Sequence, residues 1–219
     1  MRIVLVGPPG AGKGTQAAFL AKNLSIPHIS TGDLFRANIS QGTELGRKAK
    51  EYTDAGLLVP DEITIGMATD RMQQSDAENG FLLDGFPRNV GQAEALDVFL
   101  TDAGIGLDAV LDLEVPEDEV VKRIAGRRLC RNNDKHLFHV DYSPPQAEGV
   151  CDVCGGELYQ RADDTAEKVR VRLEEYHSKT EPIIDYYKQQ GLVQTISALG
   201  AVADVTARAM EALRAGERR

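Results

Sequence analysis

A glycine-rich loop near the N-terminus carries the clearest chemistry in this 219-residue chain. Residues 7–15 read GPPGAGKGT and match the GxxxxGK core of a Walker A loop, except that the hydroxyl of Thr15 comes one position late. Glycines let successive backbone N–H groups face a phosphate, the following helix adds its dipole, and Lys13 reaches the outer phosphates. The loop therefore predicts a nucleotide-phosphate site. A glycine-rich turn that binds nothing is the alternative, and the loop alone identifies no reaction.

The segments that must hold this loop alternate between strand and helix patterns. Short aliphatic runs that end at breaker residues predict buried strands near residues 2–6, 81–83, 109–115 and 192–196. Apolar residues at helical spacing predict helices near residues 13–24, 90–103, 117–128 and 202–213. This alternation predicts an α/β fold with a parallel sheet covered on both faces.

Two stretches do not fit the alternation. Residues 30–59 contain two or three short helical patterns broken by glycines, which predicts a small helical insertion. Residues 128 to 162 contain the three cysteines, two adjacent prolines and paired glycines, with few residues able to join a main core. We therefore expect a second insertion there.

Motifs beyond the loop resemble those of the adenylate kinase family. The loop itself has the family's GxPGxGKGT form, with Pro9 in the proline position. The segments STGDLFR at 30–36, LLVP at 57–60 and DGFPR at 84–88, with Gln92, resemble the family's nucleoside monophosphate site. The segments GRR at 126–128, YQRADD at 159–164 and VRL at 171–173 resemble its lid and flanks. The resemblance covers essentially the whole chain and is closest to the long-lid, metal-binding bacterial type.

This resemblance implies a fold and a reaction. The fold is the three-layer P-loop NTPase type, with a central parallel five-stranded sheet. Its core comprises residues 1–29, 60–126 and 164–219, its helical AMP-binding domain residues 30–59, and its lid residues 127–163. The reaction is reversible transfer of the terminal phosphoryl group from Mg-ATP to AMP, giving two ADP. The family also suggests a monomer.

The same resemblance assigns roles to individual residues. The catalytic set is Lys13, Arg36, Asp84, Arg88, Arg123, Arg127, Arg161 and Arg172. The ATP-binding set is Gly10, Ala11, Gly12, Lys13, Gly14, Thr15, Arg123, Arg127, Leu137, Phe138 and Gly200. The AMP-binding set is Thr31, Arg36, Leu57, Leu58, Val59, Gly85, Phe86, Pro87, Arg88, Gln92, Arg161 and Arg172.

The residue types suit those roles. Arginine donates two hydrogen bonds from a planar fork and stays charged, although each arginine alone would more often be a solvated residue paired with a neighbour. The Gln92 amide would pair with an adenine edge. Asp84 would order water around Mg²⁺ at the carboxyl end of a strand, with a turn-capping aspartate as the alternative. No general base is needed because the acceptor phosphate is already ionised.

The cysteines of the second insertion predict a metal site. Long-lid members of the family often carry two CxxC pairs, but here Cys130 is followed by Asn133 at the second cysteine position. His136 completes a Cys₃His set with Cys130, Cys151 and Cys154, which suits tetrahedral zinc in a structural site. We favour that set. Asp134 or another residue as the fourth ligand, and unpaired thiols without a metal, are the alternatives.

Composition limits the other functional classes. A net charge of -9 and a pI near 5.0 exclude a broad basic surface, so we expect no nucleic-acid partner and reject a zinc-ribbon nucleic-acid binder. The apolar run at residues 3–6 is too short for a signal peptide or a membrane span, so we expect a cytoplasmic protein without a membrane partner. Two rivals stay open: a kinase for UMP and CMP, and a nucleotide-binding regulatory module without catalysis.

Overall fold

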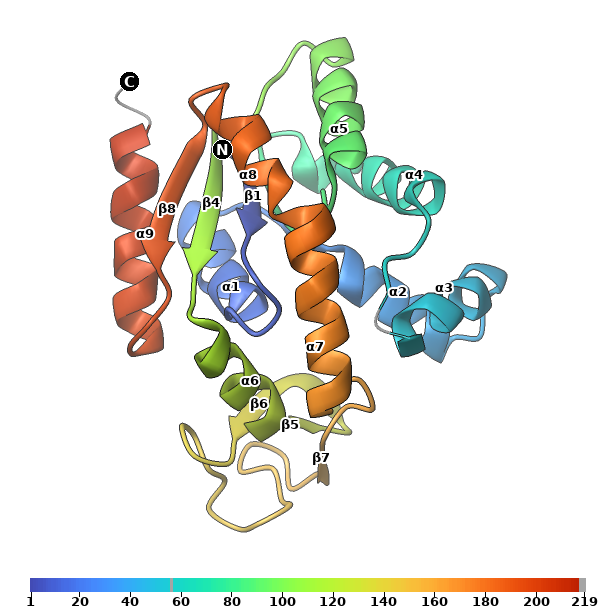
Figure 1. Ribbon diagram of the computed structural model, residues 1–219, viewed down its shortest axis with the longest axis vertical. Coiled ribbons are helices and arrows are strands. Elements are labelled where there is room, and N and C mark those ends of the chain that lie inside the picture. The colour runs from blue at the N-terminus through green and yellow to red at the C-terminus, as the bar shows by residue number, and fades with distance from the viewer. Residues whose placement is uncertain (56, 217–219) are drawn as a thin grey trace.

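A parallel five-stranded sheet forms the centre of the molecule (Figure 1), as the sequence predicts. The computed structural model describes residues 1–55 and 57–216, with the backbone alone for residues 134, 135 and 166. The strand order is β2-β3-β1-β4-β8, and all four neighbouring pairs are parallel. The strands are β1 (Arg2–Val6), β2 (His28–Ser30), β3 (Phe81–Asp84), β4 (Ala109–Glu114) and β8 (Val193–Ser197). The three-residue strand β2 is too short to produce a sequence pattern of its own.

Helices cover both faces of this sheet, so the core has three layers. Alternate side chains of β1 point to opposite faces, as strand geometry requires. Ile3 and Leu5 pack with α1 and α9, whereas Val4 and Val6 pack with α4, α5 and α8. The helices of the core are α1 (Lys13–Leu24), α4 (Asp61–Met72), α5 (Val90–Asp102), α6 (Glu117–Gly126), α7 (Ala166–Glu175), α8 (Pro182–Lys188) and α9 (Val202–Gly216), with short turns η1 (Ser75–Ala77) and η2 (Tyr176–Thr180).

Two helices, α2 (Thr31–Ser40) and α3 (Glu44–Ala55), form the first insertion. They pack so closely that a Cβ on Gly46 would lie 2.1 Å from the carbonyl oxygen of Asn38. Phe35, Ala49 and Val59 form a small apolar cluster beneath them. Ile63 and Met67 of α4 pack against this cluster, so the insertion is attached to the main core through α4.

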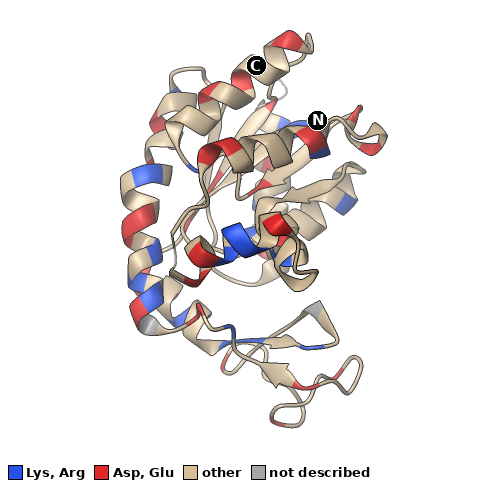
Figure 2. Cartoon of the chain, turned by 90° about the vertical axis from the view of Figure 1, so that its right-hand side faces the viewer, with Lys and Arg blue, Asp and Glu red and all other residues tan. Residues whose placement is uncertain are grey.

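The second insertion is a small antiparallel sheet, which we call the lid. Its strands β5 (Arg127–Cys130), β6 (Asn133–His139) and β7 (Leu158–Tyr159) lie in the order β6-β5-β7. The predicted helix over 117–128 is two residues too long, because Arg127 takes extended backbone angles and begins β5. Figures 1 and 2 show the lid at one end of the molecule, joined to the rest through α6 and α7. The predicted domain boundaries stay a prediction.

Within the described ranges 1–55 and 57–216, each helix falls short of the length and apolar character that a bilayer crossing requires.

Candidate active site

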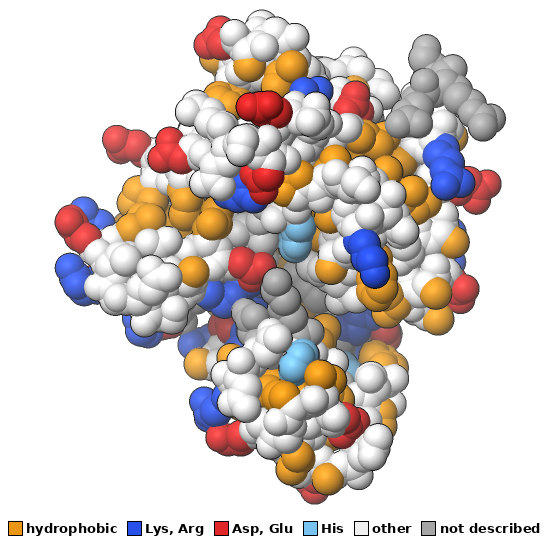
Figure 3. All heavy atoms as spheres, turned by 180° about the vertical axis from the view of Figure 1, so that it is seen from behind, with side chains coloured by type: hydrophobic (Ala, Val, Ile, Leu, Met, Phe, Trp, Pro, Cys, Tyr) orange, Lys and Arg blue, Asp and Glu red, His pale blue; other side chains and the backbone are white. Residues whose placement is uncertain are grey.

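A cavity of about 1720 Å³ opens where the phosphate loop, the α2–α3 insertion and the lid face one another. Figure 3 shows this hollow between the lid and the rest of the molecule, with basic side chains at its edges. Its floor includes Val6 and Asp84, which end β1 and β3. The cavity therefore lies at the carboxyl end of the sheet, where ligands of open α/β folds bind.

Backbone geometry explains the glycines of the phosphate loop. Gly10 has φ +78°, and a Cβ there would lie 2.8 Å from a side-chain carbon of Ile124. Gly12 has φ +89° and forms the N-cap of α1 without a side-chain cap, so the first N–H groups of this helix remain available to a ligand. The loop thus has the left-handed turns and the open helix terminus that phosphate binding needs.

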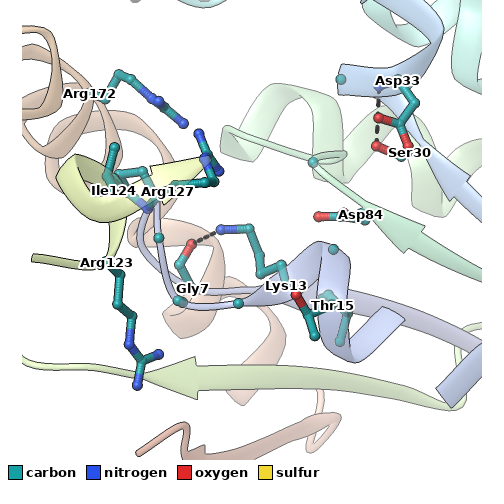
Figure 4. A pocket seen from close by; sticks show the side chains of 18 of the residues that line it. Gly7, Lys13, Thr15, Ser30, Asp33, Asp84, Arg123, Ile124, Arg127 and Arg172 are labelled. Atoms are coloured by element: carbon teal, nitrogen blue, oxygen red, sulfur yellow. Dashed lines mark hydrogen bonds between the residues drawn. The ribbon is translucent and has the colours of Figure 1, made fainter. Parts of the chain in front are cut away.

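Lys13 begins α1 and turns back over the loop. Its amine donates to the carbonyl oxygens of Gly7 at 2.6 Å and Pro8 at 2.8 Å. Burial, together with the nearby Arg88 and Arg172 cations, lowers its pKa to about 8 against the opposing effect of Asp84. Figure 4 shows Lys13, Arg127 and Arg172 around the same space. A phosphate in that space would relieve their mutual repulsion.

On the α2 side of the cavity, one backbone carbonyl accepts two hydrogen bonds. Gly85 O accepts hydrogen bonds from Oγ1 of Thr31 and from Nε of Arg88, both at 2.7 Å. Thr31 begins α2 and Arg88 follows β3, so this carbonyl joins the first insertion to the sheet. Arg36, one turn along α2, forms an ion pair with Asp33. Arg36 and Arg88 therefore point into the cavity from two different elements.

Three further arginines that line the cavity are held by carboxylates. Arg127 donates two hydrogen bonds to the buried Asp164, at 2.9 and 2.5 Å. Arg172 on α7 donates to Asp163 at 3.1 Å. Arg123 on α6 donates to Glu119 at 2.9 Å and to the carbonyl oxygen of Ala198 at 3.0 Å. Each of these guanidinium groups is thus held by at least one carboxylate.

The cations of the cavity repel one another. Burial first, and then the nearby Arg36 and Arg127, lower the pKa of Arg161 to about 10. Burial also lowers the pKa values of Arg88 and Arg172, each beside other arginines. In Figure 2, acidic and basic residues are interspersed along the chain. An acidic protein that concentrates cations in one cavity is suited to a polyanionic ligand.

Asp84 faces these cations from the end of β3. Burial alone would raise its pKa, but the hydrogen bond from His28 and the charge of Lys13 outweigh burial and hold the pKa below its ordinary value. Nε2 of His28 lies 3.4 Å from Oδ2 of Asp84. The parallel pairing of β2 with β3 places the two side chains together. Asp84 is therefore an ionised carboxylate beside the phosphate loop.

Comparison with known proteins identifies the family. A sequence profile described as adenylate kinase matches residues 5–192. The chain is similar to proteins named adenylate kinase from Streptomyces griseus (79% identity over 217 residues, 99% of each chain), Streptomyces coelicolor (75% over 214 residues, 98% of this chain and 99% of the relative) and Clostridioides difficile (55% over 217 residues, 99% of this chain and 100% of the relative).

The chain belongs to the adenylate kinase family. Its fold is accordingly the predicted P-loop NTPase fold.

The cavity brings together nearly all residues that the adenylate kinase resemblance assigns to the two nucleotides. The eight catalytic candidates, the ATP set with Leu137, Phe138 and Gly200, and the AMP set all line it, with one exception. Phe86 is 1% exposed and packs in the main core beside Leu83 and Ala93, so its side chain does not reach the cavity. The roles assigned to the lining residues stay predictions.

Sequence reasoning missed the carboxylates that orient the arginines and the histidine beside Asp84. Asp163 and Asp164 belong to the YQRADD segment at 159–164. The arginines that they hold, Arg172 and Arg127, lie up to 37 residues away in the sequence. No sequence motif points to His28, because the strand that it begins is too short to produce a pattern and Asp84 lies 56 residues away.

The four predicted metal ligands also meet in the lid. The ligand atoms of Cys130, His136, Cys151 and Cys154 lie within 4.8 Å of one another. Sγ of Cys130 is 3.4 Å from Sγ of Cys154, and Sγ of Cys151 is 3.4 Å from Nδ1 of His136. Bonds of about 2.3 Å to sulfur and about 2.1 Å to nitrogen would put tetrahedral ligands about 3.6–3.8 Å apart, so the cluster fits zinc. The side chain of Asp134 lies outside the described residues.

Proposed function

We propose that this adenylate kinase transfers the terminal phosphoryl group of Mg-ATP reversibly to AMP, giving two ADP. One observation carries the proposal: the seven cationic side chains of the predicted catalytic set, from the phosphate loop, α2, the β3–α5 connection, α6 and the lid flanks, line a single cavity. Two nucleotides with phosphates that meet at its centre would neutralise them. Family membership and the names of the relatives support the same reaction.

The two nucleotides are proposed to occupy opposite sides of the cavity. ATP would bind along the phosphate loop, with its phosphates on Lys13 and its base toward Leu137. AMP would bind beneath α2, with its phosphate between Arg36 and Arg88. Because the acceptor oxygen is already ionised, catalysis consists of alignment and of neutralising charge on the transferring group. The cations supply that neutralisation.

Asp84 is proposed to hold the water shell of Mg²⁺, assisted by the hydroxyl of Thr15. Both residues line the cavity beside Lys13. Magnesium keeps several waters and accepts few side-chain ligands, which suits one ionised carboxylate. When bound, the ion neutralises phosphate charge. The lid and the α2–α3 insertion would exclude bulk water, which otherwise hydrolyses ATP.

A panel assay tests the reaction and its acceptor. ATP is supplied with AMP, GMP, UMP or CMP, and diphosphate formation is measured for each. We expect AMP to be the preferred acceptor. Preference for UMP would assign the chain to the pyrimidine kinases, and absence of transfer to all four would favour a regulatory nucleotide-binding module.

We further propose that Cys130, His136, Cys151 and Cys154 hold a structural zinc ion. Four protein ligands leave no open position for a substrate. The lid's own apolar cluster consists of Cys130, Phe138, Cys151 and Leu158, so the metal would supply stability that so small a core lacks. A Cβ on Gly156 would lie 2.8 Å from Sγ of Cys130, which explains why glycine borders the cluster.

Metal analysis of the purified protein and its His136→Ala variant tests this site. We expect about one zinc per chain in the natural protein and weaker, chelator-sensitive binding in the variant. His139→Ala serves as the control, because His139 lies in the same sheet but contacts the carbonyl oxygen of Lys122. Unchanged, tightly bound zinc in His136→Ala would assign the fourth ligand elsewhere, with Asp134→Ala as the next variant to measure.

The proposal includes a monomer in the cytoplasm without nucleic-acid or membrane partners. The seven cations of the predicted catalytic set all line the cavity of this one chain, which supports a monomer. Three reduced cysteines, proposed here as metal ligands, suit a reducing compartment. Light scattering on the eluted protein tests the monomer.

A further inference from the structure

The side-chain amide of Gln92 is held in one orientation by partners of fixed polarity. Its Oε1 accepts the backbone N–H of Arg88 at 2.7 Å, and its Nε2 donates to Oδ1 of Asp61 at 2.7 Å. A backbone N–H only donates and an ionised carboxylate only accepts, so the partners determine which end of the amide is oxygen. A flipped amide would set donor against donor at Arg88 and acceptor against acceptor at Asp61.

Asp61 is in turn anchored by Asn89. Nδ2 of Asn89 donates to both carboxylate oxygens of Asp61, at 2.8 and 3.0 Å, and Oδ1 of Asn89 accepts the backbone N–H of Gln92 at 2.8 Å. Asn89 is the N-cap of α5 and Gln92 is its third residue, so part of this network is a helix cap. A cap requires only an acceptor at position 92, which glutamate would also supply. The donation to Asp61 is additional to capping.

After these two hydrogen bonds, the amide still has one free lone pair on Oε1 and one free hydrogen on Nε2. Gln92 lines the cavity beside Thr31 and Val59, on the side proposed for the acceptor base. The free lone pair and hydrogen match the Watson–Crick edge of adenine, where the 6-amino group donates and N1 accepts. Hypoxanthine and guanine have the reverse polarity, because their 6-oxo group accepts and their N1–H donates. The orientation of the amide therefore decides which purine it can pair with.

We propose that Asp61 is a specificity-determining residue for the acceptor, which acts by holding the Gln92 amide in the orientation that pairs with 6-amino purines and opposes 6-oxo purines. Asp61 is not among the residues that line the cavity, so it is a positioning residue. The inference rests on the proposed use of a purine nucleoside monophosphate beside Gln92. Without an acceptor at position 61, only the Arg88 N–H restrains the amide, which can then turn its Nε2 toward a 6-oxo group.

The test is the ratio of kcat/KM for AMP to kcat/KM for IMP, with ATP as the donor. These two acceptors differ at position 6 and at the N1 proton, so their ratio isolates hydrogen-bond polarity. We expect Asp61→Ala to lower this ratio about tenfold, because kcat/KM for AMP falls and kcat/KM for IMP rises. Asp61 is exposed, and an unchanged melting temperature would show that the variant folds.

Two control variants separate the hydrogen bond from charge. Asp61→Asn keeps an oxygen acceptor and should retain the ratio within about threefold. Glu62→Ala removes a negative charge from the same first turn of α4 and should leave the ratio unchanged. The proposal would be overturned if folded Asp61→Ala protein had the same AMP-to-IMP ratio of kcat/KM as the natural protein. It would also be overturned if Asp61→Asn or Glu62→Ala lowered that ratio as much as Asp61→Ala does. Natural protein that does not phosphorylate AMP would overturn the proposed function itself, and this inference with it.

Discussion

The phosphate loop and the lid hold their cations by different means. Lys13 lies against two backbone carbonyl oxygens of its own loop, between a buried strand and the helix that it begins. Arg127 and Arg172 are held by the carboxylates of Asp164 and Asp163, which lie on the connection between β7 and α7. The loop lysine is thus positioned by backbone groups, and the arginines of β5 and α7 are positioned by side chains.

The phosphate loop and the lid also differ in the size of the apolar core that supports them. Ile3 and Val4 of β1 are fully buried within the two large clusters that cover the sheet. The lid's cluster contains four residues, two of them cysteines. A site on the large core is set before the ligand arrives, whereas ion pairs on a small core can rearrange when a phosphate competes with the carboxylates. We infer that the loop binds ATP in a preformed site and that the lid adjusts around it.

The largest expected effect comes from removing the cation that the backbone positions. Lys13→Met should lower kcat about 1,000-fold without unfolding the protein, because the thioether has similar length and no charge for the transferring group. ADP formation and the melting temperature are the measurements. Lys22→Met is the matched control, since Lys22 lies in the last turn of the same helix and outside the cavity lining. If folded Lys13→Met protein had the kcat of the natural protein, Lys13 would not have the catalytic role assigned to it.

On the lid side, Asp164→Asn should lower kcat about 100-fold, because the amide cannot accept both hydrogen bonds of Arg127 and the guanidinium moves. The buried carboxylate also pairs with Arg172 at 3.6 Å, so the melting temperature should fall. Glu157→Gln is the control, because it breaks an exposed lid ion pair with Arg131 and should leave activity unchanged. If the two variants retained equal activity, the lid arginines would not depend on carboxylate positioning.

The loop side is also the side that the sequence predicts best. Strand, loop and helix over residues 2–24 follow from local patterns, and the role of Lys13 follows from its position in the motif. The lid sheet has strands as short as Leu158–Tyr159, which leave no period to read. The pairing of Arg127 with Asp164, and of His28 with Asp84, depends on contacts between distant segments that no local pattern encodes.

A smaller effect is expected from pH. The pKa of Lys13 is lowered to about 8, so in the free enzyme its charge is lost as the pH rises through that value. Because kcat/KM reports the free enzyme, kcat/KM for ATP should fall about fivefold between pH 8 and pH 9. Bound phosphates favour the charged amine, so kcat at saturating ATP should fall only at higher pH. A flat kcat/KM profile through this range would show that the loop holds Lys13 fully charged without a ligand.

The smallest effect concerns a contact that joins the two regions. Tyr142, in the loop after β6, donates to Glu119 at 2.9 Å, and Glu119 holds Arg123. Tyr142→Phe removes this hydrogen bond but keeps the ring that stacks on His139 at 4.3 Å. Because the contact is exposed, we expect KM for ATP to rise about threefold with kcat nearly unchanged. Tyr52→Phe, on α3 and outside the cavity lining, is the control. An unchanged KM would mean that the lid adjusts around ATP without help from the core, whereas an equal change in kcat would place Tyr142 in the transfer step.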